Sequence, residues 1–314
     1  MSFVQRNAWT LGLLVLFVVL LGITRLIQPN FGVTGLESLA RAALPFAFAT
    51  AAMAVVVIVG GIDLSVASMM AVCSVTAAVL MQSMGGVPAI AITLAVGVLM
   101  GLINGTLVVV TRVPDIVVTL AMLFVWQGTA LLILETPGGT ATPWMRSAIT
   151  GSFFVPGLPN ALVIVAVIVA AVWVPLRRSK LGLAIYATGS DETAAFRSGV
   201  AVGRTKAAAY AIAGLFSGFG GLSLLALTGV GEPVPGPYLL AAVASVVLGG
   251  VILGGGVGGV LGPIIAVFIL RIIRTILTLA AVDPNVTTIV EGTIMVGVVM
   301  FGAYLVLRSR RQAA

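Results

Sequence analysis

The sequence contains ten runs of apolar residues, most of them about 20 residues long, and short polar segments separate them. A helix of that length matches the roughly 30 Å thickness of a bilayer core. The runs are continuous, whereas the strands of a membrane β-barrel alternate apolar and polar residues. The pattern therefore predicts an all-α polytopic membrane protein with about ten transmembrane helices.

The predicted spans are residues 9–26, 39–59, 64–81, 89–110, 116–134, 161–174, 207–227, 239–253, 257–279 and 287–307. The sixth and eighth are short, so we expect each to be tilted, broken or partly re-entrant. The first follows a basic residue, Arg6, as the apolar part of a signal peptide would. No small-residue cleavage site follows it, which favours a retained helix.

Composition and residue types exclude several classes of protein. Only 8% of the residues are charged and 60% are hydrophobic, whereas soluble domains carry about 25% charged residues. We therefore expect one transmembrane domain over residues 1–314 and no soluble domain. Cys73 is the only cysteine and there is no histidine, so the sequence predicts no metal site, no cofactor and no nucleophile–base pair.

The basic residues are distributed unequally between the two sides of the predicted bundle. Arg25, Arg41 and Arg146 fall on one side, and Arg271 and Arg274 lie inside a span. The other side receives Arg6, Arg112, Arg177, Arg178, Lys180, Arg197, Arg204, Lys206, Arg308, Arg310 and Arg311. By the positive-inside rule, we expect both termini of this multi-pass membrane protein to be cytoplasmic. This distribution explains the net charge of +7 without nucleic acid as a partner.

The internal loop at residues 177–206 holds a short helix signal, "SDETAAFRSG". Ser190 or Asp191 is a suitable N-cap, and Gly199 is a suitable C-terminal stop. Two small alanines precede Phe196, so the helix could dock into a groove on another protein. An ordinary basic loop with a helical turn is the alternative interpretation.

The source of energy is constrained by what the sequence lacks. No G-x-x-x-x-G-K-[ST] motif occurs, so we do not expect this chain to hydrolyse ATP. Uphill transport would then need a partner or an ion gradient, and a gradient requires ionisable groups within the membrane. Asp63 and Glu291 are the candidate carboxylates. A structural ion pair of Glu291 with Arg271 or Arg274, which share a helix face, is the favoured interpretation of the latter.

Glycines occur at positions where backbones are expected to meet or turn. Four-residue spacing relates Gly97, Gly101 and Gly105, and also Gly214 and Gly218, as in helix-packing seams. The run "LGGVILGGGVGGVLG" predicts a break or turn at the cytoplasmic side. In "GGIDLS", two glycines allow the backbone to leave helical geometry. The sequence therefore predicts a hinge and cap at Gly60, Gly61, Asp63 and Ser65, in which Asp63 caps the third span.

Several stretches together resemble a known family. They are "GGIDLSVAS", "GLINGTLVVVTRVPDIVVTLAML", "LGLAIYATGSDETAAFRSGV", "YAIAGLFSGFGGL" and "AAVASVVLGGVILGGGVGGVLGP". In content, order and spacing, over nearly the whole chain, they are similar to the permease subunits of bacterial ribose-type ABC sugar importers. Two departures occur: Ser190 and Asp191 stand where relatives often have Gly-Asn, and Val257 stands where many have Arg.

The resemblance implies a transmembrane subunit that imports a monosaccharide or a similar small polar solute. It implies separate cytoplasmic ATPase subunits, a periplasmic or lipid-anchored solute-binding protein, and a second permease subunit in a homodimer or heterodimer. It also implies that the internal loop couples to the ATPase through a set of residues around its short helix. These are Gly189, Ser190, Asp191, Glu192, Ala194, Ala195, Phe196 and Gly199.

Residues that contact the solute are the least constrained by the sequence. Polar and aromatic side chains on the fourth and fifth spans are candidates for lining the pathway, although packing roles are the simpler interpretation. They are Asn104, Thr119, Phe124, Trp126 and Gln127. Two other functions stay open at this stage: an ion-coupled secondary transporter that uses Asp63 or Glu291, and a passive channel or membrane scaffold.

Overall fold

A computed structural model describes the backbone of residues 3–234 and 236–313 and the side chains of residues 9–234 and 236–300. The side chains of the terminal arginines counted above, Arg6, Arg308, Arg310 and Arg311, lie outside these ranges. The helices are α1 (Phe3–Ile27), α2 (Val33–Ile58), α3 (Val66–Met84), α4 (Gly86–Thr111), α5 (Asp115–Ile133), α6 (Pro143–Ala148), α7 (Asn160–Arg178), α8 (Lys180–Ser190), α9 (Glu192–Arg197), α10 (Val202–Thr228), α11 (Tyr238–Leu248), α12 (Leu261–Leu279) and α13 (Pro284–Ala313).

Within the described residues, eight helices are long and apolar enough to cross a membrane. The shorter apolar α11 and the apolar part of α13 bring the number of helices that enter the bilayer to the predicted ten. The sixth predicted span was expected to be short, but the corresponding helix α7 has 19 residues and is long enough to cross the membrane. The all-α polytopic fold is therefore confirmed.

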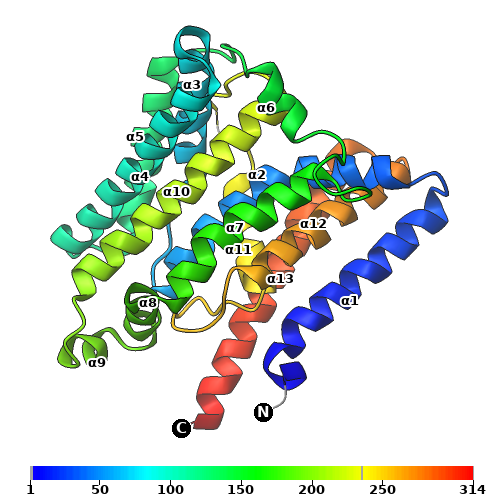
Figure 1. The fold of residues 1–314 in the computed structure, drawn as a ribbon. Helices are drawn as coiled ribbons and strands as arrows, with labels where there is room; N and C mark the ends of the chain where they lie inside the picture. Colours follow the sequence, from blue (N-terminus) through cyan, green and yellow to red (C-terminus); the bar gives the residue numbers. More distant parts are fainter. Residues whose placement is uncertain (1–2, 235, 314) are drawn as a thin grey trace.

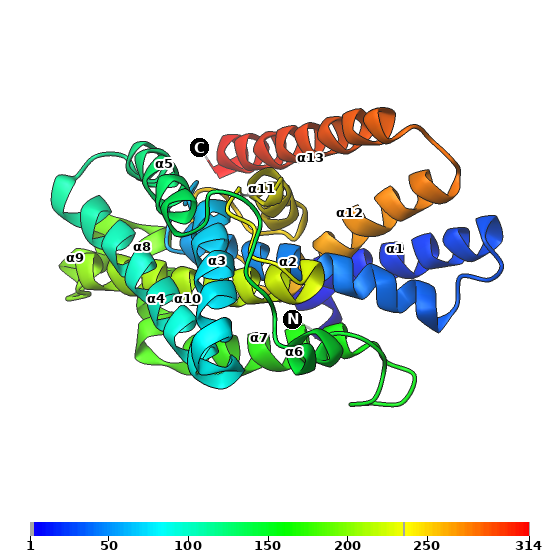
Figure 2. The same ribbon diagram turned by 90° about the horizontal axis from the view of Figure 1, so that it is seen from above.

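The centre of the bundle is α2, whose second half is almost completely buried. Figure 2 shows α2 surrounded by other helices, with α1 and α13 at the periphery. In Figure 1, the beginning of α1 and the end of α13 lie at the same end as α8 and α9, whereas α6 lies at the opposite end. The excess of basic residues assigns the end with α8 and α9 to the cytoplasm.

The predicted glycine seam joins α4 to α10. A methyl group on Gly101 would collide with the carbonyl oxygen of Tyr210, and one on Gly214 would collide with that of Gly97. Helices in lipid associate largely by close packing, and small residues allow their backbones to approach. The seam therefore holds two long helices against each other, and α10 also packs against α2 and α3.

The eighth predicted span is a half-helix with a re-entrant approach. After α10 ends, residues 229–234 are not helical and reach back to α3, and α11 begins at Tyr238. The N–H of Glu232 donates to the Ser74 hydroxyl of α3 at 3.2 Å. The Tyr238 ring lies 4.5 Å from that of Phe46, and Phe46 is at the middle of α2. With 11 residues, α11 is about 16 Å long, so it spans only the cytoplasmic half of the membrane.

Glycines form a non-helical loop between α11 and α12, as the sequence predicted. The eighth and ninth spans were expected at residues 239–253 and 257–279, but the helices end at Leu248 and begin again at Leu261. Positive φ angles at Gly250, Gly255, Gly256 and Gly258 explain the difference, because residues with a side chain rarely adopt them.

Candidate functional site at the cytoplasmic end

The internal loop contains two helices, α8 and α9, of which the sequence predicted only the second. Asp191 separates them and is the N-cap of α9: its carboxylate accepts a hydrogen bond of 2.8 Å from the N–H of Ala194. Gly199, with φ +84°, ends the segment, and its N–H donates to the carbonyl oxygen of Phe196. Lys206 on α10 donates to Glu192 at 2.7 Å. A six-residue helix is thus held at both ends.

Side chains of the predicted docking residues differ in exposure. Phe196 is 70% exposed, which is unusual for a large aromatic side chain at the water-facing end of a membrane protein. Ala195 is buried against its own chain, and Gly189 is buried as well. Exposed positions are Ser190, Asp191, Glu192, Ala194, Phe196 and Gly199. The surface that another protein could contact is therefore centred on Phe196.

Two loops meet at the end of α8, and glycines make the contact possible. The N–H of Gly256 donates to the carbonyl oxygen of Ile58 at 2.9 Å. A methyl group on Gly189 would collide with that same oxygen, and one on Gly255 would lie 2.9 Å from the Cα atoms of both Gly189 and Gly60. We call Gly60, Gly189, Gly255 and Gly256 the glycine junction. It joins the α2–α3 loop, the end of α8 and the α11–α12 loop.

The "GGID" stretch has the predicted break but not the predicted cap. Gly60 has φ +96°, so the chain leaves helical geometry there. However, α3 begins at Val66, and Ser65 rather than Asp63 occupies the N-cap position. The Asp63 carboxylate instead accepts from the N–H of Ser65 at 2.9 Å and from its hydroxyl at 2.6 Å. This local turn pairs the N–H of Ser65 before the helix starts. The first N–H groups of α3 itself have no side-chain cap.

Asp63 is completely buried, so it is shielded from lipid. Burial is the largest influence on its carboxyl group and raises its pKa above the usual 3.8, while the hydrogen bonds from Ser65 act in the opposite direction. One carboxylate oxygen, Oδ2, has no hydrogen-bond partner among the described residues. Burial therefore disfavours the charged form of this carboxyl group relative to a carboxyl group in water.

Two of the candidate pathway residues extend this network into the bundle. The amide of Asn104 donates to the Ser65 hydroxyl at 2.7 Å, and the indole N–H of Trp126 donates to the Asn104 carbonyl oxygen at 3.1 Å. A chain of hydrogen bonds therefore connects the α2–α3 loop to α4 and α5. This arrangement supports a structural role for both residues within one subunit.

The other three candidates on α5 behave differently from one another. The hydroxyl of Thr119 lies within hydrogen-bond distance of two carbonyl oxygens, that of Asp115 in its own helix at 2.8 Å and that of Ile62 in the α2–α3 loop at 3.0 Å. Gln127 is half-buried, and Phe124 is 66% exposed. Sequence reasoning missed one further bond on α5: the hydroxyl of Tyr210 donates to Asp115 at 2.9 Å. A methyl group on Gly61 would collide with both side chains of that bond.

The predicted intramembrane ion pair is confirmed. Arg274 and Glu291 approach to 2.7 Å and Arg271 and Glu291 to 4.0 Å. Glu291 is thus paired with arginines, whereas Asp63 is buried in a hydrogen-bonded turn of the α2–α3 loop. No group of three or more His, Cys, Asp or Glu residues in the described part of the chain could hold a metal ion.

The described residues form a bundle of membrane helices with a capped helix at its cytoplasmic end, which is the architecture of a polytopic membrane protein. The family model for "Branched-chain amino acid transport system / permease component" matches residues 35–299. The chain belongs to this family.

Individual relatives agree with this assignment. The chain is 31% identical over 312 residues to the autoinducer 2 import system permease protein LsrD of Escherichia coli (strain K12), and equally to LsrD of Shigella flexneri. Each alignment covers 94% of this chain and 92% of the relative. No solved structure matches the chain.

These findings confirm the functional class predicted from the sequence. The chain is the transmembrane permease subunit of an ABC importer, and it is a multi-pass protein of the inner membrane. Permease subunits are not enzymes: ATP hydrolysis belongs to a separate subunit, and a solute-binding protein is a further partner.

Proposed function

We propose that α9, with its caps, is the surface that docks onto the ATPase subunit. The observation that carries this proposal is the exposure of Phe196 on a helix fixed at both ends by Asp191 and Gly199. An apolar anchor on a pre-ordered element loses little conformational entropy on binding.

The glycine junction supports a route from that surface to the membrane helices. Because backbones meet there without intervening side chains, a displacement of α8 and α9 would press directly on the α2–α3 loop and on the α11–α12 loop. Packed backbones respond by discrete shifts rather than by continuous deformation. We propose that Gly60 and Gly61 form the hinge at which α2 and α3 respond when the ATPase subunits close.

The translocation pathway, in this proposal, lies between two permease subunits, and the face of α5 that carries Phe124 and Gln127 lines it. Phe124 is exposed in the single chain, and aromatic faces are good partners for sugar rings. Cysteine cross-linking tests the arrangement, because the single native cysteine, Cys73, is buried. Phe124→Cys should cross-link two subunits, whereas Leu99→Cys, a comparably exposed position on α4, should not. Cross-linking at Leu99 alone would place the interface elsewhere.

For the solute, we propose a small polyhydroxylated molecule of the kind that the relatives' name indicates, autoinducer 2 or a monosaccharide of similar size. The test is uptake of labelled candidates into vesicles that contain the permease, its ATPase and its binding protein, with ATP. Transport of branched-chain amino acids in place of these solutes would overturn this choice.

Docking through α9 is tested by co-purification of the ATPase subunit with the permease. Phe196→Asp should abolish co-purification, because a charge replaces the apolar anchor, while the permease still inserts and folds. Leu183→Asp is the matched control: Leu183 is 73% exposed and lies on the neighbouring α8. Normal co-purification of the Phe196→Asp variant, or equal loss in both variants, would refute docking through α9. Ala195 is less informative because it is buried.

A further inference from the structure

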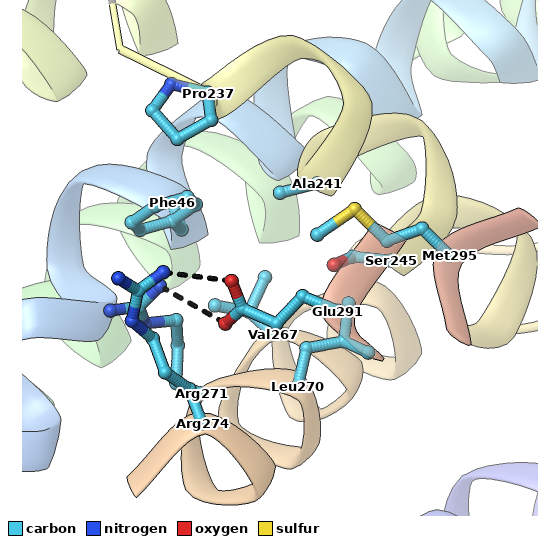
Figure 3. Close-up of a pocket in the computed structure, with 10 residues that line it drawn as sticks. All are labelled: Phe46, Pro237, Ala241, Ser245, Val267, Leu270, Arg271, Arg274, Glu291 and Met295. Atoms are coloured by element: carbon cyan, nitrogen blue, oxygen red, sulfur yellow. Dashed lines mark hydrogen bonds and ion pairs between the residues drawn. The ribbon is translucent and has the colours of Figure 1, made fainter. Parts of the chain in front are cut away.

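A small cavity lies within the membrane, between α2, α11, α12 and α13. Its volume is about 40 Å³, and ten residues line it, among them Phe46, Ser245, Arg271, Arg274 and Glu291 (Figure 3). A cavity needs roughly 10–15 Å³ on this measure to hold one water molecule. The space therefore suits a few waters or one small ion, and it is too small for a sugar ring.

The charges that line the cavity do not balance. Glu291 lies 2.7 Å from Arg274 and 4.0 Å from Arg271, so one carboxylate faces two guanidinium groups. Among the described residues that line the cavity, one positive charge remains without a counter-charge. The Arg271 guanidinium lies 4.6 Å from the centre of the Phe46 ring, and this contact offsets only part of the cost of a charge in a membrane interior.

Hydrogen-bond donors without partners face the same space. Among the described residues, the fully buried hydroxyl of Ser245 has no hydrogen-bond partner, and neither has the buried Nε of Arg271. At the rim, Pro237 precedes the first residue of α11. The N-terminus of a helix carries a partial positive charge, and here the half-helix places that charge at mid-membrane depth.

We propose that this cavity binds a small, singly charged anion, of the size of chloride or of a formate-like carboxylate. Water molecules would satisfy the unpartnered donors but would leave the charge uncompensated. An anion does both: it accepts hydrogen bonds from Ser245 and Arg271 and neutralises the excess charge. The site is distinct from the proposed sugar pathway, since its volume excludes the solute ring.

Anion-dependent thermal stability of the purified importer complex in detergent tests this site. Sodium chloride and sodium formate are each titrated at constant ionic strength against the bulky sulfonate buffer HEPES, which cannot enter the cavity. The melting temperature of the wild-type complex should rise with chloride or formate and reach a plateau. An equal melting temperature in all three anions would overturn the proposal.

Two variants separate this site from general salt effects. Arg271→Gln leaves the Arg274–Glu291 pair neutral and should abolish the anion dependence. Ser245→Ala should raise the half-stabilising anion concentration about tenfold, as expected for one lost hydrogen bond to a charged group. Ser217→Ala is the control, since its hydroxyl is also buried but donates within α10 to Ala213, and its titration should match wild type. An unchanged titration in Ser245→Ala would refute the site.

The two titrations also distinguish the source of the anion. Stabilisation by both chloride and formate supports an inorganic ion as the sufficient occupant. Stabilisation by formate alone supports the carboxylate end of an organic ligand. Because the assay measures binding and not transport, its outcome is independent of docking through α9.

Discussion

Replacement of Gly255 by alanine should uncouple ATP hydrolysis from transport. Gly255 has φ +85°, and a left-handed conformation costs a residue with a side chain about 1–2 kcal/mol. In addition, the new methyl group would lie 2.7 Å from the carbonyl oxygen of Gly189 and 2.9 Å from the Cα of Gly60. Overpacking of this kind costs about 1–3 kcal/mol, so the junction must separate or the variant loses roughly 2–5 kcal/mol.

The matched control for this substitution is Gly85→Ala at the external end of α3. Gly85 has φ +80°, but nothing lies within 4 Å of an added methyl group there. Its ψ of 173° places it in a region that is essentially restricted to glycine, so alanine there carries a backbone cost at least as large, without the collision.

The assay compares two ratios in proteoliposomes that contain the whole importer: ATP hydrolysed and solute transported, each relative to wild type. Gly85→Ala should keep both ratios near wild type after correction for folded protein. Gly255→Ala should retain ATPase activity and lose most transport. If the two variants behave alike, the glycine junction does not transmit motion and this reasoning is refuted.

Three further predictions concern the buried polar groups. Asp63→Asn should not lower the melting temperature at neutral pH. Because the pKa of Asp63 is raised, its contribution to stability is complete below about pH 3.8 and is lost as pH rises through the folded-state pKa. A larger loss of melting temperature in the variant at neutral pH than at acid pH would contradict the burial argument. Asn104→Leu should destabilise the permease by about 1–3 kcal/mol, because it leaves the indole N–H of Trp126 without its acceptor. The fluorescence of Trp126, obtained by subtracting the signal of a Trp126→Phe variant, should change when this hydrogen bond is lost. Glu291→Gln should destabilise the permease by about 1–3 kcal/mol. This is less than the roughly 3–5 kcal/mol expected for a fully buried pair, because Arg274 is 38% exposed. The double variant Arg274→Gln, Glu291→Gln should recover part of the melting temperature if the two side chains are paired.

Periodicity and residue type were sufficient to predict the features that depend on short stretches of chain. The lengths of the apolar runs predicted ten helices that enter the membrane. The start of α9 was predicted at Ser190 or Asp191, of which Asp191 is the cap, and its stop at Gly199. The spacing of Arg271 and Arg274 identified their ion pair with Glu291. In each case the physical cause, bilayer thickness, capping or charge neutralisation, acts locally or between two neighbouring helices.

Features that depend on distant segments were not predictable in the same way. The glycine junction unites backbones near residues 60, 189 and 255, and no local signal indicates which glycines meet. The helix α8 was missed because its sequence, "KLGLAIYATGS", contains two glycines and precedes a polar turn. Asp63 was expected to cap α3, but its bonds to Ser65 closed a tighter turn before the helix began. The position of Tyr238 at the middle of the membrane was not predictable either, because it is set by the contact of its ring with that of Phe46 on α2.

The central claim is that this permease has no energy source of its own and is driven through α9 by an ATPase subunit. Uptake of labelled solute into vesicles that contain the permease alone, with an imposed proton or sodium gradient, tests it most directly. The account predicts no accumulation under either gradient, and accumulation once the ATPase, the binding protein and ATP are supplied. Accumulation by the permease alone would contradict it.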